Sequence, residues 1–77
     1  MHESKLPRVT AAELLRALRR SGWEIVRQSG SHAILKHSIK PGRVTIAIHA
    51  RVIIKPKTLE TVLEQAGLTV DELRDLL

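Results

Sequence analysis

The sequence contains no cysteine, tyrosine or phenylalanine, and Trp23 is its one large aromatic residue. Without cysteine there can be no disulfide framework, no thiolate nucleophile and no cysteine-ligated zinc site. The shortage of aromatic rings disfavours modes of nucleic-acid recognition in which bases stack on rows of side chains. Trp23 follows a glycine, and we expect it in the core, between a helix and a sheet.

Long apolar runs are also absent. No stretch approaches the ~18 apolar residues that a membrane span needs, and residues 1–7 form a short polar start. We therefore expect no signal peptide and no membrane partner, and a soluble cytoplasmic protein. A chain of 77 residues folds around a single core, so we expect one domain over 1–77, with residues 1–6 the only segment that could be disordered.

Charge is distributed unevenly along the chain. Thirteen Lys and Arg residues stand against eight Asp and Glu residues, a net charge of +5. Residues 1–57 contain twelve basic and three acidic residues, whereas residues 58–77 contain one basic and five acidic residues. A basic body is typical of a protein with an anionic partner, most commonly a nucleic acid. The alternative is a solvated surface that binds nothing.

Local signals predict three helices. Thr10-Ala-Ala-Glu13 has the spacing of a capping box, and apolar residues at helical intervals follow it until Gly22, which predicts a helix over 11–21. A second helix is expected from Pro56 to the glycine at 67, because proline favours the first turn and glycine the end. Another capping box, at 69–72, predicts a short last helix.

Between the first two helices the apolar pattern changes to a period of two. It predicts three strands, over 23–28, 32–37 and 44–49, with a short turn at 29–31 and a longer one at 38–43. Consecutive strands joined this way run antiparallel. The order of helix, three strands, helix and short helix predicts an α+β fold like that of double-stranded-RNA-binding domains, with the helices on one sheet face and the other face open.

The alternation also suggests which side chains face outward. In the strand 44–49 the odd-numbered positions, including His49, are expected on the open face, because Val44, Ile46 and Ile48 form a clear apolar stripe. In the strand 32–37 the pattern does not decide whether the set with His32 or the set with His37 is buried. The two sets are His32, Ile34 and Lys36 on one side, and Ala33, Leu35 and His37 on the other.

The histidines are the candidate acid–base groups. His2 lies in the ragged start, and His32 opens the second strand directly after a turn, where a side chain can be held rigidly and still reach a substrate. If His32 and His49 share the open face with Lys36, that face suits RNA cleavage, which needs a base for the 2′-hydroxyl, an acid for the leaving oxygen and cations for the charged transition state. The alternative for each histidine is an ordinary solvated residue.

Two further features bear on phosphate and metal binding. Lys55 and Lys57 flank the start of the second helix, where free amides and the helix dipole favour an anion, although a solubilising cap is an equal alternative. A metal site is not expected, because no carboxylate lies near His32, His37 and His49 in sequence, and we expect no cofactor.

Four segments of the sequence form a recognisable set: a helix ending in Ser-Gly-Trp, the segment Val26-Arg-Gln-Ser-Gly-Ser-His32, a strand ending in His49, and Lys57-Thr-Leu-Glu-Thr-Val-Leu-Glu-Gln-Ala-Gly-Leu68. Together they resemble the HicA (YcfA-like) toxins. The resemblance extends over roughly Leu6 to Leu77, and Gly30-Ser31-His32 is among its most specific parts. Ala47 stands where the family often has proline, and Lys57 where it often has glycine.

The resemblance implies a fold like that of double-stranded-RNA-binding domains and an mRNA-cleaving toxin of a type II toxin–antitoxin pair. It also implies a HicB-type antitoxin, encoded beside the toxin, that covers the active face, and it places the catalytic role on His32. DNA by itself is not an expected partner, because it lacks the 2′-hydroxyl.

The resulting hypothesis is a metal-independent endoribonuclease in which His32 is the general base or acid. Gly30 and Ser31 would position His32, His49 would be auxiliary, and the RNA backbone would bind to Arg27, Lys36, Lys55 and Lys57. One alternative is a non-catalytic RNA-binding module of the same fold. The other is a protein-interaction subunit whose basic face meets an acidic partner.

Overall fold

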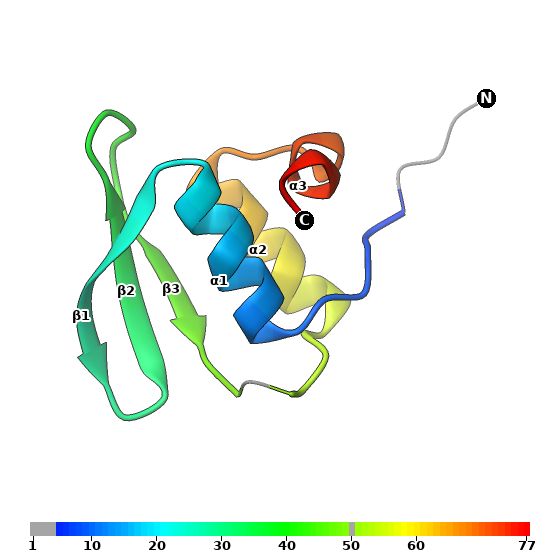
Figure 1. Ribbon diagram of the computed structural model, residues 1–77, viewed down its shortest axis with the longest axis horizontal. Coiled ribbons are helices and arrows are strands. Elements are labelled where there is room, and N and C mark those ends of the chain that lie inside the picture. The colour runs from blue at the N-terminus through cyan, green and yellow to red at the C-terminus, as the bar shows by residue number, and fades with distance from the viewer. Residues whose placement is uncertain (1–4, 50) are drawn as a thin grey trace.

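The computed structural model describes residues 5–49 and 51–77. Within them lie three helices and three strands, in an order that confirms the expected α+β fold (Figure 1). In chain order the elements are α1 (Ala11–Arg20), β1 (Trp23–Ser29), β2 (His32–His37), β3 (Val44–Ala47), α2 (Pro56–Ala66) and α3 (Val70–Leu76).

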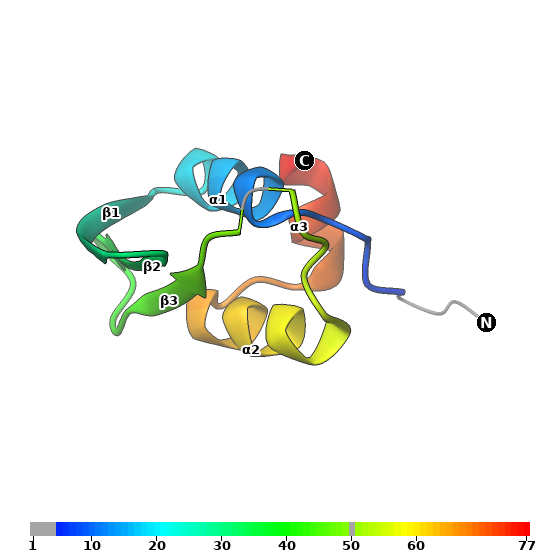
Figure 2. The same ribbon diagram turned by 90° about the horizontal axis from the view of Figure 1, so that it is seen from below.

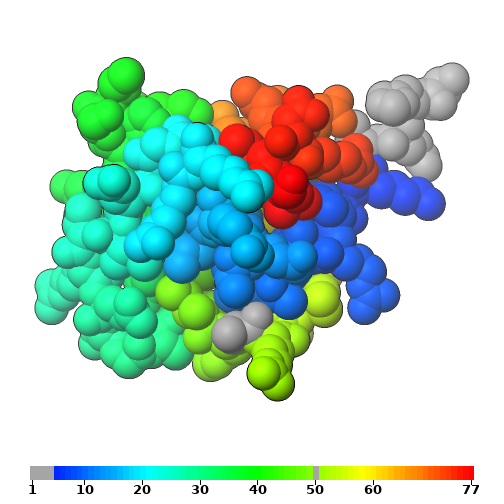
Figure 3. Space-filling model, viewed as in Figure 1, coloured from blue at the N-terminus to red at the C-terminus, as the bar shows by residue number. Residues whose placement is uncertain are grey.

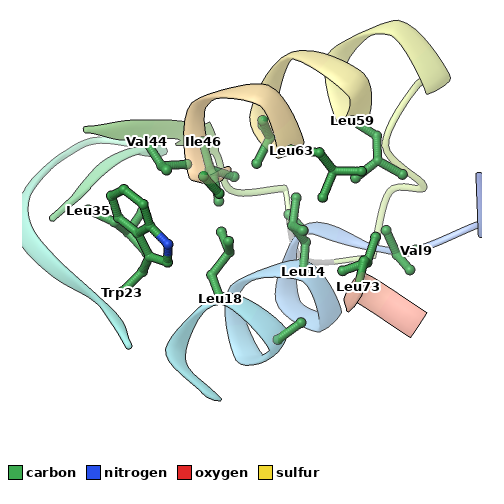
Figure 4. Packing of buried hydrophobic residues seen from close by; sticks show 14 of the residues in the cluster. Val9, Leu14, Leu18, Trp23, Leu35, Val44, Ile46, Leu59, Leu63 and Leu73 are labelled. Carbon is green, nitrogen blue, oxygen red and sulfur yellow. The ribbon is translucent and has the colours of Figure 1, made fainter. Parts of the chain in front are cut away.

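The three strands form an antiparallel sheet in the order β1-β2-β3, with β2 in the centre. Seen along the sheet, α1 and α2 both lie on the same side of it, and none of the helices within 5–49 and 51–77 covers the other face (Figure 2). Apolar side chains from the inner sheet face and both helices meet between the layers (Figure 4). Trp23 is completely buried there, which confirms its expected place in the core.

The two capping boxes and Gly67 set helix ends where the sequence predicts them. Both capping boxes are formed, by Thr10 with Glu13 and by Thr69 with Glu72. The threonine amides donate hydrogen bonds to these two carboxylates and lower the pKa of Glu13 and Glu72. Gly67 ends α2 in the left-handed conformation, at φ 65°.

Three boundaries differ from the sequence-based expectation. Helix α1 ends at Arg20 rather than at 21, because Ser21 already leaves the helical conformation as the C-cap. Strand β1 runs to Ser29, which pairs with His32 across a two-residue turn. Strand β3 was expected to reach His49 but ends at Ala47, because β2 begins at His32, the residue opposite Ala47, and the chain beyond that pair is the turn before β2.

The segment before α1 and the connector before α2 run beside each other. Ile54 donates its backbone amide to the Val9 carbonyl at 2.8 Å, and Thr10 and Ile53 form an isolated β-bridge. Of the segment 1–6, residues 1–4 lie outside the described residues, and Leu6 packs against the core. No helix in the described ranges is both long enough and apolar enough to cross a membrane.

Candidate active site

The turn between β1 and β2 places His32. Ser29 and His32 face each other across the ladder, so Gly30 and Ser31 alone make the turn. Gly30 has φ 58°, and no residue other than glycine has a positive φ in the described chain, which is the pattern of a type II′ hairpin turn. No neighbour lies within 4 Å of a Cβ placed on Gly30, so the space in front of the turn is open.

The third strand holds the same turn from the other side. Ala47 lies directly opposite His32, and the next residue, Ile48, donates its backbone amide to the carbonyl of Ser31. The backbone at His32 is therefore fastened to both neighbouring strands. A side chain on a backbone fastened in this way can be held in a fixed geometry.

The side chain of His32 points to the open face. Ala33 and Leu35 are 0% exposed, whereas His32 and Lys36 are exposed, which decides the parity that the apolar pattern left open. On β3, Val44 and Ile46 are buried as expected. The open face consequently carries His32 and Lys36 from β2 together with Thr45 and Ala47 from β3.

A β-bulge brings Arg27 to this face. Strict alternation from Trp23 and Ile25 would direct Arg27 toward the core, but the register shifts between Ile25 and Arg27, and Val26 has no partner. Arg27 instead pairs with Ile34, an open-face position, and stands diagonal to His32. Diagonal neighbours are about 7–8 Å apart, within reach of an arginine side chain.

His37 has a different role from His32. Its Nδ1 accepts hydrogen bonds from the backbone amides of Ile39 and Lys40, at 3.0 and 3.1 Å, so Nε2 carries the proton and donates to the Ser21 carbonyl at 2.9 Å. The ring also packs edge-on against Trp23, with centroids 5.3 Å apart. Both ring nitrogens of His37 are thus engaged: Nε2 joins the end of β2 to the end of α1, and Nδ1 holds the backbone directly after β2.

His49 lies just beyond β3 and is exposed. It borders a hollow of about 170 Å³ that we call the His49 hollow. Ala47, the ladder partner of His32, lines the same hollow, and so do Lys55 and Thr58 from the start of α2. The hollow is lined by Ala11, Ala47, His49, Val52, Ile53, Ile54, Lys55 and Thr58.

The start of α2 borders this hollow through Lys55 and Thr58. Lys55 is the N-cap, its side chain makes no capping hydrogen bond, and Pro56 occupies the first turn. Lys57 is exposed in the same turn. Since the first amides of a helix have no intrahelical partner, this end combines hydrogen-bond donors with two positive side chains.

The expected site residues are not equally close. Gly30, Ser31, His32 and Arg27 gather at the turn, and His49 and Lys55 adjoin them through Ala47. Lys36 lies four residues from His32, about 13 Å along the strand, directly opposite Glu24. In the described part of the chain, no three His, Asp or Glu side chains come together in a way that could hold a metal ion.

Ile48 helps to hold the turn before His32, a role that the sequence pattern does not indicate. It was assigned only to the apolar stripe, yet its amide fastens the turn that precedes His32. No local signal could have shown this, because the bond joins residues from different strands.

The fold and the exposed histidine define a small α+β protein with a basic surface around one sheet end. A family model described as "HicA toxin of bacterial toxin-antitoxin" matches residues 11–68, three quarters of the chain. The chain therefore belongs to the HicA toxin family, whose members act in toxin–antitoxin pairs, and an antitoxin is the implied partner. No curated protein matches it.

Proposed function

We propose that this toxin is an endoribonuclease that cleaves mRNA in the cytoplasm, with His32 as the general base or acid. The observation that carries the proposal is the placement of His32. It is an exposed imidazole on the central strand, fixed by the pairing of Ser29 and Ala47 on either side, with open space in front of the adjoining turn.

The chemistry available to this site is transfer of the phosphoryl group within RNA. A base removes the proton of the 2′-hydroxyl, the oxygen attacks the adjacent phosphorus, and an acid protonates the departing 5′-oxygen. Histidine suits either step because its unperturbed pKa lies near neutrality. Arg27, diagonal to His32, supplies a positive charge for the transition state, so the mechanism needs no metal.

The remaining cations would bind the RNA backbone. Lys55 and Lys57 stand at the uncapped start of α2, where a phosphate can accept hydrogen bonds from main-chain amides as well. Lys36 is the more distant contact on the open face. His49, which lines the same hollow as Lys55, would assist at the leaving oxygen or orient the substrate.

The antitoxin, of the HicB type, would act by covering this surface. An acidic protein can complement the cations that bind RNA, so one surface serves both partners. We expect His32 to become inaccessible in the complex. A complex in which His32 stays exposed and RNA cleavage continues undiminished would contradict this part of the proposal.

The test compares wild type, His32→Ala and His49→Ala on a labelled transcript in excess EDTA, with induced growth arrest scored in parallel. Wild type should cleave and His32→Ala should not, while both bind the RNA with affinities within a few-fold. Equal cleavage by wild type and His32→Ala would move the active centre elsewhere. RNA binding without cleavage by wild type would favour a binding module, and negligible RNA binding at low salt would favour a protein-interaction subunit.

A further inference from the structure

A second group of cations lies on α1, outside the site described above. Arg16 and Arg19 are exposed and border a shallow hollow of about 260 Å³, the α1 hollow, which is lined by Ala12, Leu15, Arg16, Arg19 and Ile48. Neither guanidinium makes an ion pair or hydrogen bond with any residue in 5–49 or 51–77. By contrast, Arg20 donates to the Leu76 carbonyl at 2.6 Å.

The α1 hollow adjoins the turn that carries His32. Ile48, which lines it, donates its amide to Ser31 and directly follows Ala47, the ladder partner of His32. Neighbouring Cα atoms are about 3.8 Å apart and paired ones about 5 Å, so the Cα atoms of Ile48 and His32 lie within about 10 Å. Figure 3 shows the blue surface of α1 and the blue-green β1–β2 hairpin on one face, with a yellow-green strip from the end of β3 between them.

The segment 47–49 separates two hollows. Ala47 and His49 line the His49 hollow, and Ile48 lines the α1 hollow. Both hollows are therefore bordered by the segment that begins at the ladder partner of His32, and both are bordered by cations, Lys55 in one and Arg16 with Arg19 in the other.

We propose that Arg16 and Arg19 bind phosphates of the RNA strand where it continues from the cleaved bond onto α1. The inference rests on the proposed function and adds a binding site for the substrate. Guanidinium groups bind phosphate oxygens through paired N–H donors, and the apolar floor of Ala12, Leu15 and Ile48 suits the uncharged face of a nucleotide. Glu13, one turn before Arg16, has its carboxylate hydrogen-bonded to Thr10.

This site predicts a dependence on RNA length. A short RNA can occupy His32 and Arg27 without extending onto α1, whereas a longer strand bound at His32 extends over Arg16 and Arg19 as well. The contacts on α1 should therefore matter for long substrates and leave short ones unaffected. An acidic segment of the antitoxin is the competing occupant, and the experiment separates the two.

The experiment uses His32→Ala protein, which keeps the RNA intact, and adds R16Q/R19Q. The matched control is Arg43→Glu, which changes the net charge by the same two units and lies directly before β3, at the opposite end of the sheet from the His32 turn. Circular dichroism establishes that each variant is folded. Dissociation constants are measured over a range of salt for unstructured RNAs of about four and about sixteen nucleotides, and for the cognate antitoxin.

We expect R16Q/R19Q to weaken binding of the long RNA about tenfold and to make its logarithmic salt dependence shallower by about 1.4, since each single-strand phosphate contact contributes ~0.7. Binding of the short RNA should match that of Arg43→Glu. Equal effects of R16Q/R19Q and Arg43→Glu on the long RNA would overturn the inference, as would loss of antitoxin affinity alone. If the parent protein binds no RNA, the proposed function fails, and this inference fails with it.

Discussion

Nε2 of His37 lies 2.9 Å from the carbonyl oxygen of Ser21, and this hydrogen bond joins the last residue of β2 to the C-cap of α1. His32 opens the same strand on the opposite face and makes no side-chain hydrogen bond within the described residues. The two histidines of β2 thus lie on opposite faces: His37 is a structural residue, and His32 is the candidate catalytic one.

His37→Ala should lower the free energy of unfolding by about 2–3 kcal/mol, because two amides and one carbonyl lose their partner and the contact with Trp23 is removed. His32→Ala should change it by no more than about 0.5 kcal/mol, as is usual for an exposed side chain. Urea denaturation of both variants measures the difference. Similar losses in the two variants would contradict the separate roles.

Gly22→Ala should destabilise the protein for two separable reasons: backbone strain at a positive φ, and a clash of the new Cβ with the ring of His37. Gly22 has φ 103°, and a Cβ there would lie 2.5 Å from Nε2 of His37. Gly42→Ala is the matched control, since φ is 80° but nothing lies within 4 Å. We expect Gly42→Ala to cost about 1–2 kcal/mol and Gly22→Ala clearly more.

A double mutant tests the clash between the new Cβ and the ring of His37. In protein that already carries His37→Ala, the added cost of Gly22→Ala should fall to about that of Gly42→Ala, because the clashing ring is gone. An unchanged cost, measured by the same urea denaturation, would show that backbone strain alone limits this position.

His49→Ala should reduce RNA cleavage less than His32→Ala. A group that transfers a proton in the transition state contributes about 10²–10⁴-fold. His49 lies past the end of β3, without the two-sided strand pairing that fixes His32, so we expect a loss of about tenfold or less. Initial rates on one transcript, measured at several pH values, make the comparison. An equal loss of cleavage rate in His49→Ala and His32→Ala would contradict this prediction and show that both histidines contribute equally to catalysis.

The capping boxes should make folding sensitive to acid. Hydrogen bonds from Thr10 and Thr69 lower the pKa of Glu13 and Glu72 below the ordinary glutamate value in the folded protein. Their contribution to stability is therefore fully present above the unfolded pKa and is lost as the pH falls through the lower folded value. E13Q/E72Q should lose less stability than wild type between pH 5 and pH 3 in urea titrations.

The control for this prediction is Glu60→Gln. Glu60 is exposed on α2 and makes no side-chain hydrogen bond within the described chain, so its replacement should leave the acid response unchanged. An acid response of E13Q/E72Q as steep as that of wild type would mean that the capping carboxylates do not set it.

The sequence was most informative where the physical cause is local. The capping box at Thr10, the proline at the start of α2 and the left-handed Gly67 each act within a few residues, and the helices they delimit were predicted to within one residue. The place of His32 at the start of β2 followed from the adjoining turn for the same reason.

Features that depend on pairing between strands could not be predicted. The face occupied by Arg27 is set by the bulge at Val26, which exists only in relation to β2. The end of β3 at Ala47 is set by where β2 begins, and the anchoring amide of Ile48 by the position of Ser31. Sequence spacing within one strand contains none of this information.

The side chain of Gln65 accepts a hydrogen bond from the backbone amide of Thr45 at 3.2 Å, on the outer edge of β3. Strand β3 is also only four residues long, so this edge of the sheet is poorly suited to receive another strand. The longer β1 remains as the edge at which a strand could be added. If two copies paired through β1, a short β3 strand would form each outer edge of the joined sheet. Because neither outer edge would readily accept another strand, growth into an open-ended fibre would stop at the pair.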